Sequence, residues 1–195
     1  DRMVRRAAEA GLPVTLYRPP LIAGASSGTT WHDGDLLQRL LMGALAVGAS
    51  PDLAWELDVV PVDYVADAVT ALAWDQESQG KTFHLQHPEP LLLSTLLSQI
   101  AEATGEWRVL PMQEWIAEIE QSPENPLQPL LPFFQHRWGK EGLTYPERNC
   151  SGQRARPSCV WTTQELMKQG VRCPRWDELI GPWSSVLLPK FVKTS

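Results

Sequence analysis

The sequence predicts an α/β protein built on part of a parallel sheet, and two segments carry that prediction. The first, Val14 to Gly24, is an apolar strand that leads directly into a turn with two prolines. The second, Asp58 to Ala68, is a nearly continuous apolar strand followed by an amphipathic helix. No G-x-G-x-x-G or G-x-x-G-x-x-G occurs, so no segment could seat a dinucleotide pyrophosphate at a helix N-terminus. We therefore expect the C-terminal part of a larger nucleotide-dependent enzyme.

The first ninety residues are expected to alternate helices and strands, as in βαβ units. Good helix formers before Gly11 open the chain without an N-cap ahead of Asp1, so we expect the chain to start within a longer helix. The expected elements are a helix over 1–10, a strand over 14–17, a loop over 23–34, a helix over 35–47, a strand over 57–62, a helix capped by Asp63 and a strand over 81–86.

The second half is expected to be mostly helical and lined by aromatic side chains. The 17 prolines and 9 tryptophans of the chain concentrate after residue 105, which favours irregular segments there. The expected elements are a helix over 92–104, a strand over 107–110, helices over 113–120 and 127–138, a helix from a capping box at Thr162–Glu165 to Gly170, and a helix over 176–188 with Pro182 inside it. We expect a dinucleotide-binding domain over 1–90 and a helical substrate-binding subdomain over 91–195.

Composition excludes several classes of function. The net charge is -6 and no stripe of Lys and Arg occurs, which disfavours nucleic-acid binding. No apolar run approaches the roughly 20 residues of a membrane span, and the N-terminus does not resemble a signal peptide. Cys150, Cys159 and Cys173 are too widely spaced to indicate a disulfide framework or a zinc site. We expect a cytoplasmic protein.

The turn at the end of the first strand is the best candidate for chemistry. In a dinucleotide-binding sheet, the loops at the carboxyl ends of the strands face the cofactor. Pro19 and Pro20 fix the backbone and remove two N–H donors, so carbonyls and the N–H groups of Leu21 and Ile22 remain. Such a wall, from Arg18 to Ile22, suits the carboxamide and ribose of a nicotinamide. The alternative is a plain turn at a strand end.

Other polar clusters have simpler explanations. In the segment 32–35, Asp35 is expected to cap the following helix, with a turn before it. His84 and His87 flank a strand end without a third ligand nearby, so a zinc site is not expected. No G-x-S-x-G occurs, and a hydrolytic thioesterase is therefore not supported. We assign no catalytic and no metal-binding residue.

Two motifs make the chain resemble the extended short-chain dehydrogenases/reductases. They are Arg-Pro-x-x-Ile-x-Gly at 18–24 and Val-Pro-Val-Asp-Tyr-Val-Ala-x-Ala at 60–68. Within that family the chain is most similar to the terminal thioester reductase domains of nonribosomal peptide and polyketide synthases, over residues 1–115. One departure is Pro20, where the family usually has glycine.

The resemblance implies a Rossmann-like fold and the reduction of a carrier-bound thioester by NADPH to an aldehyde or alcohol. It implies that Arg18, Pro19, Pro20, Leu21 and Ile22 line the nicotinamide end of the cofactor. It further implies that residues 91–195 receive the acyl or peptidyl chain and the phosphopantetheine arm of a carrier protein. The Tyr-x-x-x-Lys pair and the glycine-rich loop of the family do not occur in these 195 residues, so the chain alone is expected to be inactive.

Two other functions stay open. A nucleotide-sugar epimerase or another extended dehydrogenase shares the Arg-Pro turn, but usually has a more polar, arginine-bearing substrate lobe. A non-catalytic module that docks a carrier protein belongs to a different class. Carrier binding without any cofactor would distinguish that module from a reductase.

Overall fold

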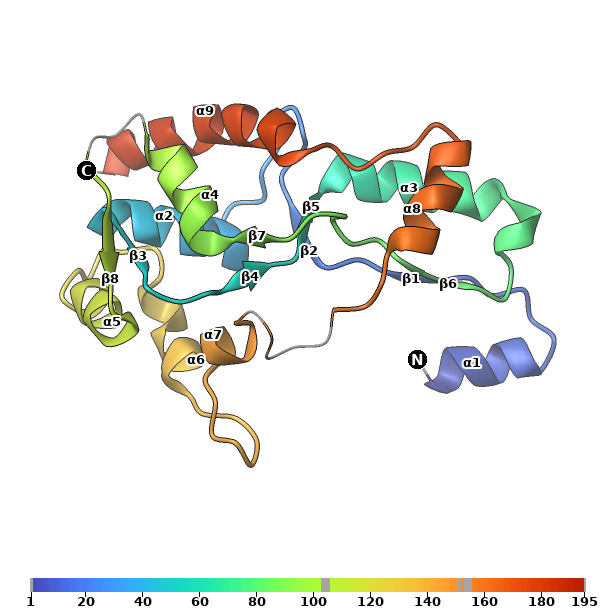
Figure 1. Ribbon diagram of the computed structural model, residues 1–195, viewed down its shortest axis with the longest axis horizontal. Coiled ribbons are helices and arrows are strands. Elements are labelled where there is room, and N and C mark those ends of the chain that lie inside the picture. Colours follow the sequence, from blue (N-terminus) through green and yellow to red (C-terminus); the bar gives the residue numbers. More distant parts are fainter. Residues whose placement is uncertain (1, 103–105, 151, 153–155, 195) are drawn as a thin grey trace. The chain divides into compact units, whose positions relative to one another are not determined.

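The computed structural model describes residues 2–102, 106–150, 152 and 156–194, without the side chains of 190–194 (Figure 1). The chain divides into two compact units, each made of three segments. Unit 1 comprises Asp1–Ile22, Asp58–Glu89 and Pro157–Pro174, and unit 2 comprises Ala23–Leu57, Pro90–Arg156 and Arg175–Ser195. One segment of unit 1 ends at Glu89 and the next segment, which belongs to unit 2, begins at Pro90, beside the expected domain boundary. The functional assignment of 1–90 and 91–195 stays a prediction.

Unit 1 contains a parallel pair of strands with helices. Its elements are α1 (Arg2–Glu9), β1 (Leu16–Arg18), β5 (Val59–Pro61), α3 (Val62–Trp74), the 3₁₀ turn η1 (Gln76–Ser78), β6 (Thr82–His84) and α8 (Val160–Lys168), while β2 (Leu21–Ala23) begins at its edge. β1 and β6 run parallel, with Tyr17 opposite Phe83. This pair confirms the predicted α/β class and parallel strands.

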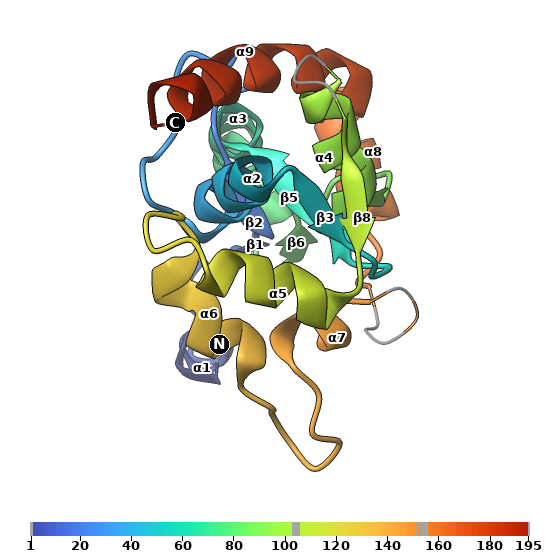
Figure 2. The ribbon, with the colours of Figure 1, turned by 90° about the vertical axis from the view of Figure 1, so that its left-hand side faces the viewer.

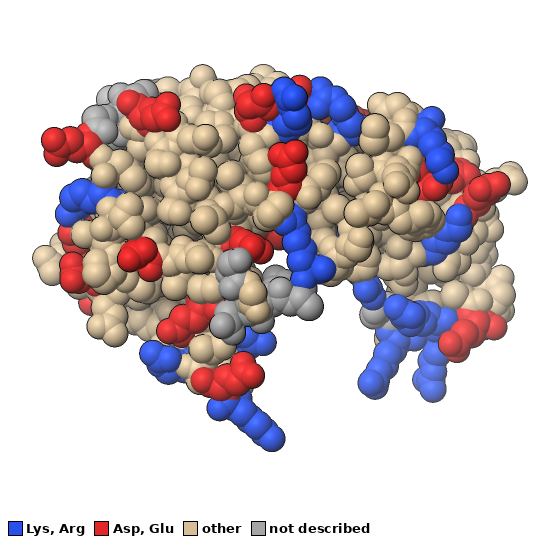
Figure 3. Space-filling view, viewed as in Figure 1, with Lys and Arg blue, Asp and Glu red and all other residues tan. Residues whose placement is uncertain are grey.

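The core of unit 1 lies along one face of α3. Tyr64, Ala68 and Leu72 recur at helical spacing and are buried against Phe83 and Leu166. The three arginines of α1 are exposed. Figure 3 shows basic side chains gathered over that helix, while basic and acidic side chains are mixed over the rest of the face in view.

Unit 2 is predominantly helical and contains two small strand pairs. Its elements are α2 (Leu36–Val47), β3 (Ala49–Pro51), β4 (Glu56–Leu57), β7 (Leu91–Leu92), α4 (Leu93–Ala101), β8 (Arg108–Leu110), α5 (Met112–Glu120), η2 (Gln128–Leu130), α6 (Leu131–Gln135), α7 (Tyr145–Arg148) and α9 (Trp176–Thr194). β3 pairs with β8 in parallel, and β4 pairs with β7 antiparallel. α9 packs on α4 and α2 (Figure 2). No helix of the described residues has the combined length and apolar character that crossing a bilayer requires.

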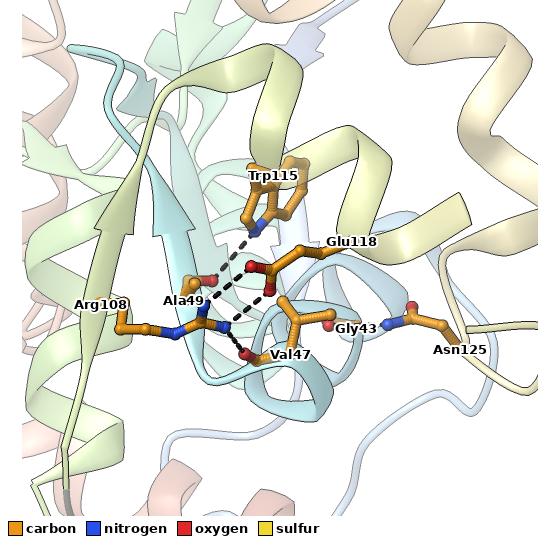
Figure 4. Close-up of polar contacts among 7 residues, drawn as sticks. All are labelled: Gly43, Val47, Ala49, Arg108, Trp115, Glu118 and Asn125. Atoms are coloured by element: carbon orange, nitrogen blue, oxygen red, sulfur yellow. Dashed lines mark hydrogen bonds and ion pairs between the residues drawn. The ribbon is translucent and has the colours of Figure 1, made fainter. Parts of the chain in front are cut away.

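Polar side chains hold α5 and α2 in place through bonds to backbone carbonyls and to one another (Figure 4). The Trp115 indole N–H donates to the Ala49 carbonyl at 3.0 Å. Arg108 binds both carboxylate oxygens of Glu118, at 2.8 and 2.6 Å. Asn125 donates to the Gly43 carbonyl at 3.0 Å, and a Cβ at Gly43 would lie 2.7 Å from the Asn125 amide oxygen. Only glycine therefore lets these segments approach so closely.

Most tryptophans of unit 2 are structural. Trp31 and Trp183 meet edge to face with ring centroids 5.2 Å apart, and the Trp183 indole N–H donates to the Ala25 carbonyl at 3.1 Å. Gly28 has a φ of 75°, and a Cβ there would lie 2.5 Å from the Pro182 carbonyl oxygen. The loop after β2 is thus pressed against α9. Burial of Trp31, Trp55, Trp115, Trp176 and Trp183 places these indoles in the core rather than along a channel.

Two predicted caps are wrong. α3 begins at Val62 with Pro61 at the N-cap position, so Asp63 lies in the first turn rather than at the cap. β5 runs directly into the helix, so the helix starts two residues earlier than predicted. α8 begins at Val160 after Cys159, so Thr162 lies inside the helix. Its hydroxyl instead accepts the His84 N–H of β6 at 3.3 Å.

Several predicted element limits also differ. The helix expected over 127–138 is a 3₁₀ turn followed by a helix that ends at Gln135, because Pro129 and Pro132 each remove a backbone donor. The strand expected over 57–62 is divided into β4 and β5 around Asp58. α4 ends at Ala101, and residues 103 and 104 of the expected helix lie outside the described residues. α9 continues beyond the expected limit to Thr194 and contains both Pro182 and Pro189.

Candidate functional site

The turn after β1 is held by backbone hydrogen bonds on both sides. The Arg18 carbonyl accepts the Leu85 N–H at 3.1 Å, which extends the pairing with β6. After the two prolines, the Leu21 N–H donates to the Asp58 carbonyl at 3.1 Å. The expectation that Leu21 offers a free N–H is therefore wrong, because the start of β2 uses it. The turn is stiff by pairing as well as by proline.

The same turn presents an apolar, partly exposed surface at the carboxyl end of a parallel strand. Pro19 is exposed, Ile22 is 40% exposed, and Pro20 and Leu21 are half-buried. Among the described residues, no backbone N–H outside the helices and strands donates to the carbonyl of Pro19 or Pro20. The nicotinamide group is a flat apolar ring with an amide donor, and it is complementary to an apolar wall with acceptor carbonyls. The assignment of Arg18 to Ile22 to the nicotinamide end of a dinucleotide stays a prediction.

A buried polar pair lies at the same edge, and the sequence did not single it out. Gln86 follows β6 by two residues, and its amide N–H donates to a carboxylate oxygen of Asp58 at 2.7 Å. Gln86 is 6% exposed, and no described group donates to its amide oxygen. The signal that could have found it is a polar residue directly beyond a buried strand, where ligands of parallel sheets bind.

The histidine and aspartate clusters have structural roles. The Asp35 carboxylate accepts the Gln38 N–H at 2.7 Å, which confirms the predicted cap of α2. Both ring nitrogens of His87 lie within hydrogen-bond distance of backbone carbonyls, at 2.8 Å from Glu89 and 3.0 Å from Pro174. Among the described residues, no group of three or more His, Cys, Asp or Glu side chains could hold a metal ion.

Tyr64 of the second motif belongs to the core. Burial raises the pKa of its phenol, and the nearby thiols of Cys173 and Cys159 raise it further. Burial likewise raises the pKa of Cys173 to about 12, with Cys159 contributing in the same direction. A thiol that stays protonated at neutral pH is a poor nucleophile. Tyr64 of the second motif therefore serves packing, and the turn from Arg18 to Ile22 is the better candidate site.

Comparison with known proteins identifies similar domains. The family model described as male sterility protein, an NAD-binding family, matches residues 1–69. Over 188 residues the chain is 26% identical to a linear gramicidin synthase of Brevibacillus parabrevis, and over 181 residues it is 31% identical to isonitrile lipopeptide synthase of Streptomyces coeruleorubidus. These alignments cover 91% of the chain in both cases, but 3% and 12% of the relatives.

Solved structures agree with this result. The terminal R domain of the myxalamid PKS-NRPS pathway superposes with a TM-score of 0.78 at 32% identity, over 96% of this chain and 46% of that domain. A thiolation-reductase di-domain from an archaeal nonribosomal peptide synthetase superposes at 0.73 with 19% identity, over 100% of this chain and 39% of that one. The chain thus spans less than half of these solved proteins.

Proposed function

The chain belongs to the terminal reductase domains of nonribosomal peptide and polyketide synthases, and from this membership we propose that it serves the NADPH-dependent reductive release of a carrier-bound acyl or peptidyl thioester. The product would be an aldehyde or an alcohol. The likeness to a reductase domain over nearly the whole chain is the observation that carries the proposal.

Within that function, residues Arg18 to Ile22 would hold the nicotinamide end of the cofactor. The apolar side chains of Pro19 and Ile22 would pack against the ring, and the Pro19 and Pro20 carbonyls would accept from its carboxamide. NADPH supplies the hydride when it is bound. The contribution of this chain is to orient the ring and to keep water from one side of it.

Residues 91–195 would form the substrate lobe, which receives the acyl chain and the phosphopantetheine arm. The thiolation-reductase neighbour supports a carrier protein as the partner. The three free thiols support a reducing location such as the cytoplasm. The 195 residues alone would be inactive, since they contain neither the glycine-rich loop nor Tyr-x-x-x-Lys.

The test replaces Ile22 by aspartate in the reductase domain that contains these residues. A carboxylate in the apolar wall faces the ring and is repelled by the cofactor's phosphates, so KM for NADPH should rise at least about tenfold. The matched control is Leu12→Asp, since Leu12 is a 59% exposed residue of unit 1 outside the turn. NADPH consumption with a carrier-bound thioester is the measurement.

Each alternative has its own result. A domain that binds the carrier but never consumes NADPH would be a docking module, and a domain that acts on nucleotide sugars would be an epimerase. NADPH consumption by the isolated 195 residues would contradict their proposed inactivity. Equal effects of Ile22→Asp and Leu12→Asp would remove the turn from the cofactor site.

A further inference from the structure

A pocket of about 370 Å³ lies within unit 2 and is lined by residues in and beside α5, α6 and α7. Figure 2 shows these three helices. Its lining residues come from one face of α5, from the end of α6 and the segment after it, and from the N-cap and first turn of α7: Met112, Gln113, Ile116, Glu120, Phe134, Gln135, Arg137, Thr144 and Glu147. This volume accommodates roughly a dozen non-hydrogen atoms, taking about 30 Å³ for each as for a water molecule. Pockets of this size bind small organic groups.

The pocket has an apolar base and a polar rim. Phe134 is fully buried, and Met112 and Ile116 are half-buried beside it. A methionine adapts its shape to varied apolar groups. The exposed amides of Gln113 and Gln135 stand at the rim, where they offer both donors and acceptors. The Gln135 amide also donates to the Glu120 carboxylate at 2.6 Å, which links α6 to α5 beside the pocket.

The charges of the lining disfavour an anionic ligand. Glu147 accepts the Thr144 N–H and hydroxyl at 2.7 and 2.9 Å, and these bonds hold the pKa of its carboxyl below the ordinary value. Arg137, the only cation of the lining, lies 3.6 Å from Glu147 and donates to the Gly142 carbonyl at 2.7 Å. The lining therefore has two carboxylates against one guanidinium that is already paired.

We propose that this pocket takes the neutral, apolar acyl or peptidyl group of the thioester substrate, with an amide of that group at Gln113 and Gln135. The inference rests on the proposed function, and it adds the chemical class of the group and the side chains that receive it. An acyl group that ends in a carboxylate would be rejected by Glu120 and Glu147.

The test uses the full chain with its methionine methyl groups labelled for NMR. Met112 lines the pocket, whereas Met3 and Met167 are 84% and 63% exposed elsewhere. The probe S-hexanoyl-N-acetylcysteamine should shift the Met112 signal and leave the other two unchanged. S-adipoyl-N-acetylcysteamine, which has a carboxylate in place of the terminal methyl group, should bind at least about tenfold more weakly.

Two neighbouring substitutions on α5 give a matched comparison. Gln113→Trp fills the rim of the pocket and should weaken binding of the hexanoyl probe at least about tenfold. Glu114→Trp places the same side chain on an exposed residue outside the lining and should leave binding within about twofold. Unchanged Met42 signals would show that both variants keep the core.

These measurements involve no cofactor, so they are read separately from the reductase assay. If the reductase domain reduces the hexanoyl thioester while Met112 never responds, the pocket inference is overturned and the proposed function stands. If Met112 responds and no thioester is ever reduced, the proposed function fails and the substrate role of the pocket fails with it. Equal binding of both probes would overturn the preference for neutral groups.

Discussion

Unit 1 and unit 2 use their aromatic and polar side chains differently. In unit 2 the indoles of Trp115 and Trp183 are fully buried, and both donate to backbone carbonyls. In unit 1, Trp161 is 41% exposed while it stacks on Phe83 at 5.0 Å, and Trp74 is 85% exposed. Five of the seven tryptophans of unit 2 are therefore buried, Trp138 being 41% exposed, whereas both tryptophans of unit 1 are exposed.

This difference distinguishes side chains that stabilise the fold from side chains that we expect to bind a ligand. A filled core whose buried indoles donate to carbonyls gives a rigid support, as Trp115 and Trp183 do in unit 2, although the Trp31 indole N–H of that unit has no partner among the described residues. Exposed apolar residues such as Ile22, and a buried acceptor without a donor among the described residues such as the Gln86 amide oxygen, are features of an edge that binds a ligand. We therefore expect substitutions to have larger effects on stability in unit 2 and on binding in unit 1.

The largest expected effect compares two tryptophan truncations. Trp183→Ala should lower the free energy of unfolding by about 3–5 kcal/mol, because it leaves a cavity and an Ala25 carbonyl without its donor. Trp161→Ala should cost only about 1 kcal/mol, the value of an exposed aromatic stack. Chemical denaturation followed by circular dichroism measures both. Equal losses would contradict the difference between the units.

A smaller effect concerns buried polar side chains. Asn125→Ala removes the donor to the Gly43 carbonyl and the acceptor for the Leu127 N–H, and should cost about 2 kcal/mol. The Thr163 hydroxyl of unit 1 is buried and has no partner among the described residues. Thr163→Val keeps its shape, so the free energy of unfolding should stay unchanged or rise by about 1 kcal/mol. A loss comparable to that of Asn125→Ala would show a partner for this hydroxyl.

The smallest expected effect is a difference in pH dependence. The folded pKa of Cys173 is about 12, above its ordinary value of 9.0, so its contribution is fully present below pH 9.0 and is lost as the pH rises toward 12. The folded pKa of Glu147 lies below 4.5, so its contribution is present above pH 4.5 and is lost as the pH falls through the folded value. Cys173→Ala should flatten the alkaline loss and Glu147→Gln the acid loss, in unfolding measured across pH. A variant that flattened the opposite limb would contradict the assignment.

Sequence patterns predicted the elements whose signals are local and strong. The cap at Asp35, the strands β1 and β6 and the helix after Pro61 follow from residue type and periodicity, whereas the pairing of the two strands was not predicted. The capping box was predicted at the wrong place. Thr144–Glu147 and Thr162–Glu165 share the pattern T-x-x-E, and only the first forms the box, because the Thr162 hydroxyl serves the His84 N–H across the fold.

Only part of the candidate site could be predicted, because only part of it depends on residues that are neighbours in the sequence. The proline turn from Arg18 to Ile22 is visible as a local signal, and its role at the cofactor stays a prediction. The use of the Leu21 N–H depends on Asp58, and the pairing of Gln86 with Asp58 depends on residues 28 positions apart. No local pattern encodes such long-range partners. The pocket of unit 2 is equally invisible, since it combines three helices.

The contact of Gly28 and Ala25 with α9 sets an order of events during synthesis. The bond from Trp183 to Ala25 joins residues 158 positions apart, so the loop after β2 stays without its support until nearly all of these residues have left the ribosome. Contacts of such long range form late and at a high cost in chain entropy. A premature stop just before Trp183 would leave most of the sequence translated, yet with this loop unanchored.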